Sequence, residues 1–305
     1  MNSIKYLSII FLFLSQLYSQ DHSGALRTAR LMEKRGDAES AIAIYSDILD
    51  KKHDHQAYIN LKKLLLRQEK FDSLSSIIQT YKERFSNKIE PYLDLGEAYW
   101  KLKKNNLAKQ EWSLAEKKFG SQSNTYKKFF YLFNNLGLSE ESQTIIDRAR
   151  EKFKDPTLLS IDIANYHFSR KSFKVAVTEY LNYLSSHPVQ IKMVTDRILL
   201  ISDDKDSNPV ILAILNEKVK LNPVLYGPLL ADYYFKTQQY DLSLAQHLNL
   251  GFSTKKDVRR WMEFSNSLRA ESQYEKAIYG YEKILSVKNK HITNFQFAQK
   301  FHPFL

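Results

Sequence analysis

Residues 92–100 read Tyr-Leu-Asp-Leu-Gly-Glu-Ala-Tyr-Trp, and Ala108, Trp112 and Ala115 follow. The apolar residues of this stretch recur every three or four places, which predicts two amphipathic helices joined by a short turn. The same pattern returns over residues 36–48 and over residues 261–284. A pattern that returns along a chain indicates a repeat, and a repeat determines the whole fold.

Aligning these stretches places one matching residue in each of eight units. The matching residues are Ala41, Leu74, Ala108, Ser142, Ala176, Ile211, Ser243 and Ala277, at spacings of 33, 34, 34, 34, 35, 32 and 34. Most of them are small, which predicts that two helix backbones approach closely there. Prolines fall between units, where a helix must stop. Asp155-Pro156 and Asn222-Pro223 each predict a cap followed by the first turn of a helix.

This pattern resembles the tetratricopeptide repeat, a helix-turn-helix unit of 34 residues. The resemblance covers roughly Ser23 to Lys288 and implies an all-α, right-handed superhelical solenoid of about eight antiparallel helix pairs. We therefore expect one solenoid domain over residues 20–288, because each pair buries its apolar face only on its neighbours. The sixth unit is divergent, since residues 202–209 replace its tight turn. Residues 289–305 are expected to form a capping helix or a truncated one.

The N-terminus predicts a signal peptide over residues 1–19. Lys5 supplies the positive charge, residues 6–17 are largely apolar, and Ser19 offers a small residue for cleavage. The apolar run is shorter than the roughly 20 residues that a membrane span needs, and an uncleaved anchor is the alternative. The chain has no Cys, so it carries neither a lipid anchor on Cys nor a disulfide. We expect an exported bacterial protein, periplasmic or at the cell surface.

Nothing in the sequence predicts catalysis. No two glycines lie closer than the 12 residues between Gly24 and Gly36, which excludes glycine-rich phosphate loops. The eight His are scattered, and Asp203, Asp204 and Asp206 lack the spacing of a calcium loop. The net charge of +11 is spread among 34 acidic residues, which favours a solvated helical surface over nucleic-acid binding. We expect no enzyme activity, no cofactor, no metal site and no nucleic-acid partner.

The resemblance implies that the first helix of each pair lines a concave groove, which takes up a peptide or a helix of a partner protein. Carried onto this sequence, the groove residues are Arg27, Arg30, Lys34, Asn60, Lys63, Arg67, Trp100, Lys127, Lys128, Tyr131, Phe168 and Phe235. The basic residues at its start suit an acidic segment or a C-terminal carboxylate. The three aromatic residues are either anchors for the partner or packing against the adjacent repeat. Of the two-carboxylate clamp that chaperone-binding relatives use, only Asn60 is present, so a chaperone tail is not expected.

The sequence leaves three functions open. The first is a non-catalytic protein-interaction scaffold of the bacterial cell envelope, whose protein or peptide partner is unidentified. The second is a peripheral membrane or cell-wall binder that uses the basic surface. The third is an adaptor or sensor part of a larger complex. The apolar C-terminal end also allows a homodimer.

Overall fold

The computed structural model describes residues 23–52, 54–252 and 254–286, and every regular element in these ranges is a helix. The predicted signal peptide over residues 1–19 and the C-terminal segment over residues 289–305 lie outside the described residues. The helices fall into two compact units, Met1–Lys154 and Asp155–Leu305. Each unit is described by itself.

Unit 1 is a series of antiparallel helix pairs. In each pair we name the first helix A and the second helix B. Unit 1 begins with a helix over residues 23–34. It continues with α2 (Ala38–Lys52), α3 (His55–Arg67), α4 (Phe71–Arg84), α5 (Glu90–Lys101), α6 (Asn105–Phe119), α7 (Ser123–Asn135) and α8 (Ser139–Phe153). In two places a B helix also packs on the next A helix: α2 on α3, and α4 on α5.

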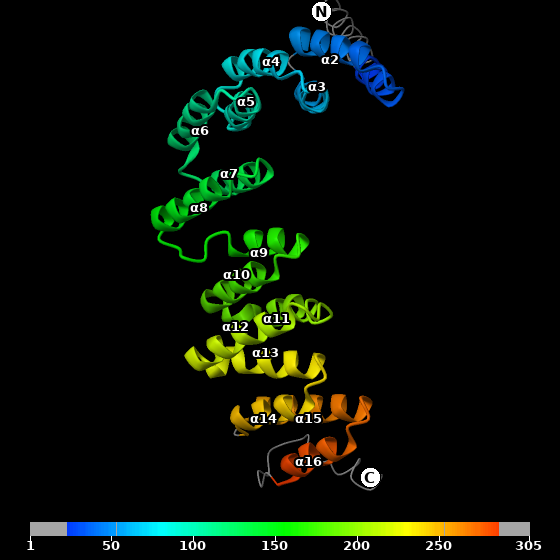
Figure 1. The fold of residues 1–305 in the computed structure, drawn as a ribbon, viewed down its shortest axis with the longest axis vertical. Coiled ribbons are helices and arrows are strands. Elements are labelled where there is room, and N and C mark those ends of the chain that lie inside the picture. The colour runs from blue at the N-terminus through cyan, green and yellow to red at the C-terminus, as the bar shows by residue number, and fades with distance from the viewer. Residues whose placement is uncertain (1–22, 53, 253, 287–305) are drawn as a thin grey trace, which may run out of the picture. The chain divides into compact units, whose positions relative to one another are not determined.

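Unit 2 continues the same alternation. It contains α9 (Ser160–Ser169), α10 (Phe173–Ser186), the short 3-10 helix η1 (Pro188–Gln190), α11 (Ile191–Leu199), α12 (Asn208–Leu221), α13 (Pro223–Lys236), α14 (Tyr240–Asn249), α15 (Lys255–Ala270) and α16 (Tyr274–Leu285). Figure 1 shows these helices labelled in chain order. The all-α, paired-helix architecture predicted from the sequence is confirmed.

The repeat residues lie where the sequence places them. All eight matching residues, Ala41 to Ala277, are at most 4% exposed. Glycine allows an especially close approach at Gly96, because a Cβ there would lie 2.1 Å from Trp112 Nε1 on the facing helix. Small residues therefore bring helices A and B together, and bulky neighbours such as Trp112 fill the space around them.

The turn between helices A and B also repeats. In seven pairs a left-handed residue stands five places before the matching residue: Gly36, Glu69, Lys103, Gly137, Lys171, Gln238 and Ser272. A left-handed residue after a helix lets later N–H groups reach back to its last free carbonyls. The Lys104 N–H, for example, donates to the Tyr99 carbonyl at 2.9 Å. The same short turn thus closes each of these pairs.

The sixth pair differs, as the sequence predicts. Asp206 stands at the corresponding place but is not left-handed. Turns over residues 200–206 replace the tight connection, and α11 and α12 each pack on α10 and α13. The two helices of this pair are therefore held mainly by their neighbours.

The two predicted helix starts have different outcomes. Asn222 caps α13 as expected, because its side chain accepts from the Leu225 N–H at 3.0 Å. The prediction at Asp155-Pro156 is wrong. Asp155 Oδ1 instead accepts from both the N–H and the hydroxyl of Thr157, each at 2.8 Å, which makes a local turn. The helix α9 then begins only at Ser160.

Candidate protein-binding surface

Ion pairs join the successive A helices of unit 1. Arg67 of α3 pairs with Glu33 of the helix over residues 23–34. Lys62 of α3 reaches Asp94 Oδ1 of α5 at 2.7 Å, and Lys128 of α7 pairs with Glu90 at the start of α5. Opposite charges thus fix these four helices side by side. We call their outward-facing side the A-helix surface.

The central contact of this surface is a buried network around Asp94. The Tyr58 hydroxyl donates to Asp94 Oδ2 at 2.6 Å, while Lys62 donates to the other oxygen. Burial, followed by the charge of Asp94, raises the pKa of Tyr58, so the phenol keeps its proton. Burial also raises the pKa of Glu97, and Lys62 and Lys101 oppose this shift. Cations of α3 and of α5 itself therefore lie beside Asp94 and Glu97, while Lys128 of α7 pairs with Glu90.

Four predicted cations of the A-helix surface remain without an ion pair among the described residues. They are Arg27, Arg30, Lys34 and Lys63, and all four side chains are exposed. Arg67 and Lys128, predicted in the same set, are engaged in ion pairs with Glu33 and Glu90. Of the predicted cations, those that are exposed and unpaired among the described residues thus lie on the helix over residues 23–34 and on α3.

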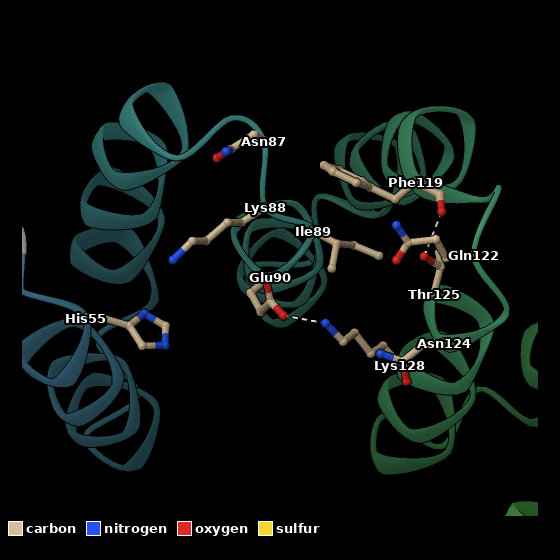
Figure 2. A pocket seen from close by; sticks show the side chains of 10 residues that line it. All are labelled: His55, Asn87, Lys88, Ile89, Glu90, Phe119, Gln122, Asn124, Thr125 and Lys128. Atoms are coloured by element: carbon tan, nitrogen blue, oxygen red, sulfur yellow. Dashed lines mark hydrogen bonds and ion pairs between the residues drawn. The ribbon is translucent and has the colours of Figure 1, made fainter.

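A polar pocket of about 420 Å³ opens where the N-terminal ends of α3, α5 and α7 meet. Figure 2 shows its lining residues, which are His55, Asn87, Lys88, Ile89, Glu90, Phe119, Gln122, Asn124, Thr125 and Lys128. Lys88 extends toward His55, and the Glu90–Lys128 ion pair crosses the pocket (Figure 2). Most of the lining is polar, so the pocket suits a polar group of a ligand better than an apolar anchor.

The ion pair with Lys128 keeps the carboxyl of Glu90 ionised. Burial works to raise the pKa of Glu90, but the hydrogen bond from Lys128, a backbone hydrogen bond and the charges of Lys128 and Lys88 together outweigh it, and the pKa is lowered from its usual value. Among the groove residues predicted from the sequence, Lys128 is the one that also lines this pocket.

The three predicted aromatic anchors pack on the first turn or the body of their own B helix. The ring of Trp100 lies 5.9 Å from that of Trp112, and Phe168 lies 5.8 Å from Phe173. Phe235 lies 5.4 Å from Tyr240. All three are half-buried, and Phe235 also lies 6.1 Å from Phe264 of the next A helix, α15, so packing against the adjacent repeat accounts for part of its burial.

The remaining predicted residues of unit 1 are less accessible than the four unpaired cations. Asn60 is half-buried; it accepts from the Gln56 amide at 3.0 Å and donates to the Tyr45 hydroxyl at 3.4 Å. Lys127 and Tyr131 of α7 are half-buried too.

Unit 2 carries a different A-helix surface. Two repeats share one contact, in which a B-helix tyrosine donates at 2.7 Å to an A-helix asparagine: Tyr180 to Asn165, and Tyr281 to Asn266. Part of the Asp232 side chain of α13 is exposed, but the surrounding protein removes water from its carboxyl, and this desolvation, with the charges of Glu263 and Asp196 and against that of Arg260, raises its pKa to about 6.

Three partners on the A-helix surface were not predicted from the sequence. Glu33, Lys62 and Glu90 form the ion pairs with residues 34, 32 and 38 places along the chain. A spacing near one repeat between opposite charges on successive A helices is the signal that could have found them.

Two further features are absent from the described residues. No helix there combines the length and the apolar character needed to cross a membrane. The same ranges hold no group of three or more His, Asp or Glu side chains arranged to bind a metal ion.

No protein-family model matches the chain, and no curated protein sequence matches it significantly. Among solved structures, a tetratricopeptide repeat protein from Parabacteroides merdae is 12% identical, over 92% of this chain and 97% of that one, with a TM-score of 0.35. The C-terminal part of a repeat protein of the same kind from Cytophaga hutchinsonii is 15% identical, over 88% and 98%, with a TM-score of 0.35.

A third similar structure is a complex of the TPR2AB domain of yeast Sti1 with pHSP90. It is 14% identical, over 85% of this chain and 99% of that one, with a TM-score of 0.31. The helix pairs, the repeat of about 34 residues and the shared left-handed turn are present in this chain itself. The chain has the tetratricopeptide-repeat fold.

The A helices of unit 1 are joined side by side by ion pairs, and their common surface is the candidate site. Its charges are of two kinds. One set is used internally, between helices, and the other, at Arg27, Arg30, Lys34 and Lys63, faces solvent.

Proposed function

We propose that this chain is a non-catalytic protein-interaction scaffold that binds an acidic segment of a partner on the A-helix surface of unit 1. The observation that carries the proposal is the set of four exposed cations, Arg27, Arg30, Lys34 and Lys63, that have no ion pair among the described residues. Cations left uncompensated beside fully paired neighbours attract and orient an acidic partner.

The polar pocket of Figure 2 supports the same proposal. It lies on the A helices α3, α5 and α7, and Lys88 is exposed at its wall. A carboxylate of the bound segment would find Lys88 and the amides of Asn87 and Asn124 there, because ammonium and amide N–H groups are donors for carboxylate oxygens.

The test is a crosslinked pull-down from native cell envelopes with two charge-reversed chains. The variant Arg30→Glu with Lys63→Glu changes the A-helix surface. The control, Lys117→Glu with Lys152→Glu, makes the same change in net charge at exposed lysines of the B helices α6 and α8. The proposal predicts that the first variant recovers about tenfold less partner, a loss of about 1.4 kcal/mol of binding free energy. Equal recovery by both variants would contradict it.

We further propose that the chain is exported and that its signal peptide is cleaved near Ser19, which places the scaffold in a bacterial envelope. The apolar run after Lys5 and the small residue at Ser19 support this. N-terminal sequencing of the protein from envelope fractions tests it. A mature chain that starts near Gln20 is the expected result, and a chain found in the cytosol with residues 1–19 intact would overturn it.

A further inference from the structure

Three aliphatic side chains of unit 2 stand out by their exposure. Val189 is 87% exposed, Val224 83% and Leu221 73%, more than any other large apolar residue that the structure describes. All three lie in connections between a B helix and the next A helix: Val189 in η1 after α10, and Leu221 and Val224 where α12 passes into α13. Such side chains leave apolar surface in contact with water, which costs free energy.

The two connections lie at the same edge of unit 2. The helix α11, which follows η1, packs on α13. The Tyr226 hydroxyl, in the first turns of α13, donates at 3.3 Å to the carbonyl of Leu181 in the second half of α10. The end of α10 and the start of α13 are therefore neighbours, and Figure 1 shows both connections at one side of these helices.

A third connection extends this edge. A Cβ built on Gly227 would lie 2.5 Å from Leu250 Cδ2, so the segment after α14 touches the first turns of α13. That segment leads into α15, whose first two residues are Lys255 and Lys256. We call these three connections, residues 187–190, 220–224 and 250–256 without residue 253, the connection edge.

The exposed charge on the connection edge is positive. Lys220, Lys255 and Lys256 are exposed, and none has an ion pair within the described part of the chain. Asp257, the acid next to them, is already engaged, since it completes the capping box with Thr254 and pairs with Arg260. The connection edge thus carries both exposed aliphatic side chains and lysines that have no ion pair among the described residues.

We propose that the connection edge binds the surface of an anionic lipid bilayer, with Val189, Leu221 and Val224 in the headgroup region and the lysines on the lipid phosphates. Apolar side chains gain by leaving water at that depth, and each Lys near an anionic surface adds a favourable electrostatic contribution. The site is separate from the A-helix surface of unit 1, so either proposal can fail without the other.

The first test places a fluorophore at the edge. Because the chain has no Cys, the substitution Val224→Cys gives a single labelling site for an environment-sensitive dye. Leu242→Cys is the control, since Leu242 is exposed in the first turn of α14, where the chain enters that B helix from the other side of the pair. The probes are phosphatidylcholine vesicles with and without phosphatidylglycerol.

The dye at position 224 should shift to the blue and become protected from an aqueous quencher only with the anionic vesicles, and high salt should reverse the change. The dye at position 242 should not respond. A solvent-like dye at position 224 in the presence of anionic vesicles would overturn the proposal, as would equal responses at both positions.

The second test removes the aliphatic tips. With the dye at position 224, the pair Val189→Ser and Leu221→Ser should weaken the apparent vesicle affinity about tenfold. The control pair, Leu200→Ser and Val210→Ser, removes exposed aliphatic side chains at the connection between α11 and α12, and it should leave the affinity unchanged. Equal losses in both pairs, or no loss in the first, would show that the aliphatic tips do not enter the lipid. Circular dichroism confirms that each variant keeps its helices.

Discussion

The Tyr58 hydroxyl lies 2.6 Å from Asp94 Oδ2, across 36 residues of sequence, and both side chains are buried. With Lys62 on the other carboxylate oxygen, this contact joins α3 to α5, two successive A helices. The A-helix surface of unit 1 is thus built over a buried polar network rather than over apolar packing alone. A network of this kind fixes the spacing of the helices, because its members lose their partners if the helices move.

We expect Tyr58→Phe to destabilise the chain by about 1.5–3 kcal/mol, because the substitution removes a buried hydrogen bond to a charged group. The measurement is urea unfolding followed by circular dichroism. Tyr99→Phe is the matched control in α5, since no hydrogen bond of its hydroxyl is found among the described residues. Similar unfolding midpoints for the two variants would mean that the hydroxyl of Tyr58 contributes nothing specific.

Gly96→Ala should destabilise the chain by about 1–3 kcal/mol through overpacking, because the new methyl group would overlap the indole of Trp112. The emission of Trp112 should shift as its ring moves. Gly24→Ala makes the same change in the helix over residues 23–34, where nothing lies within 4 Å, and should stabilise it by up to about 1 kcal/mol. Thermal unfolding compares the two. A harmless Gly96→Ala would mean that the close approach of α5 and α6 is not needed.

Asp232 should titrate near pH 6, since the surrounding protein raises its pKa to about 6. A carboxyl whose pKa is raised by folding binds its proton more tightly in the folded chain than in the unfolded chain. Its contribution to stability is therefore present below pH 4 and is lost as the pH rises through 6. Carboxyl carbon NMR checks the pKa directly. Asp232→Asn should flatten this part of the stability profile, whereas Asp203→Asn, in an exposed turn, should not.

His247 should show the opposite dependence. It is buried, stacks on Phe264 at 3.9 Å, and its Nδ1 has no hydrogen-bond partner among the described residues. Burial, and then the charge of Arg260, lower its pKa to about 3. The unfolded chain takes up this proton below about pH 6.5, so stability is lost as the pH falls from there toward 3.

His247→Phe should keep the stacking on Phe264 and remove this loss, so the melting temperature of the variant should fall less between pH 7 and pH 4 than that of the wild type. His187→Phe, at an exposed histidine, is the control. Because Asp232 acts with the opposite sign in the same range, the two variants are compared singly. An unchanged pH profile for His247→Phe would contradict the assignment.

The repeat was predictable because burial and spacing are both visible in the sequence. A buried position recurs about every 34 residues from Ala41 to Ala277, and this recurrence is enough to predict the succession of helix pairs. The left-handed turn residue was not predictable in the same way. Only Gly36 and Gly137 carry the residue type that favours this conformation, while Glu69 and Lys103 adopt it under the constraint of the packed helices.

The candidate surface was predicted in part. The sequence indicates the basic start at Arg30 and Lys63, but it does not show which cations are compensated. That depends on how successive A helices are aligned sideways, which sets the partners Glu33 for Arg67 and Glu90 for Lys128. Asp155 was misread for a related reason, because a side chain that can cap a helix can equally accept from a residue two places on.

The central claim is that the A-helix surface of unit 1 holds the partner, and site-specific photocrosslinking in living cells tests it most directly. A photoreactive residue replaces Lys63 on the A helix α3 in one chain and Gln79 on the B helix α4 in another, both exposed. We predict a discrete crosslinked adduct from position 63 that Arg30→Glu weakens, and none from position 79. Adducts of equal intensity from the two positions, or an adduct from position 79 alone, would contradict the account.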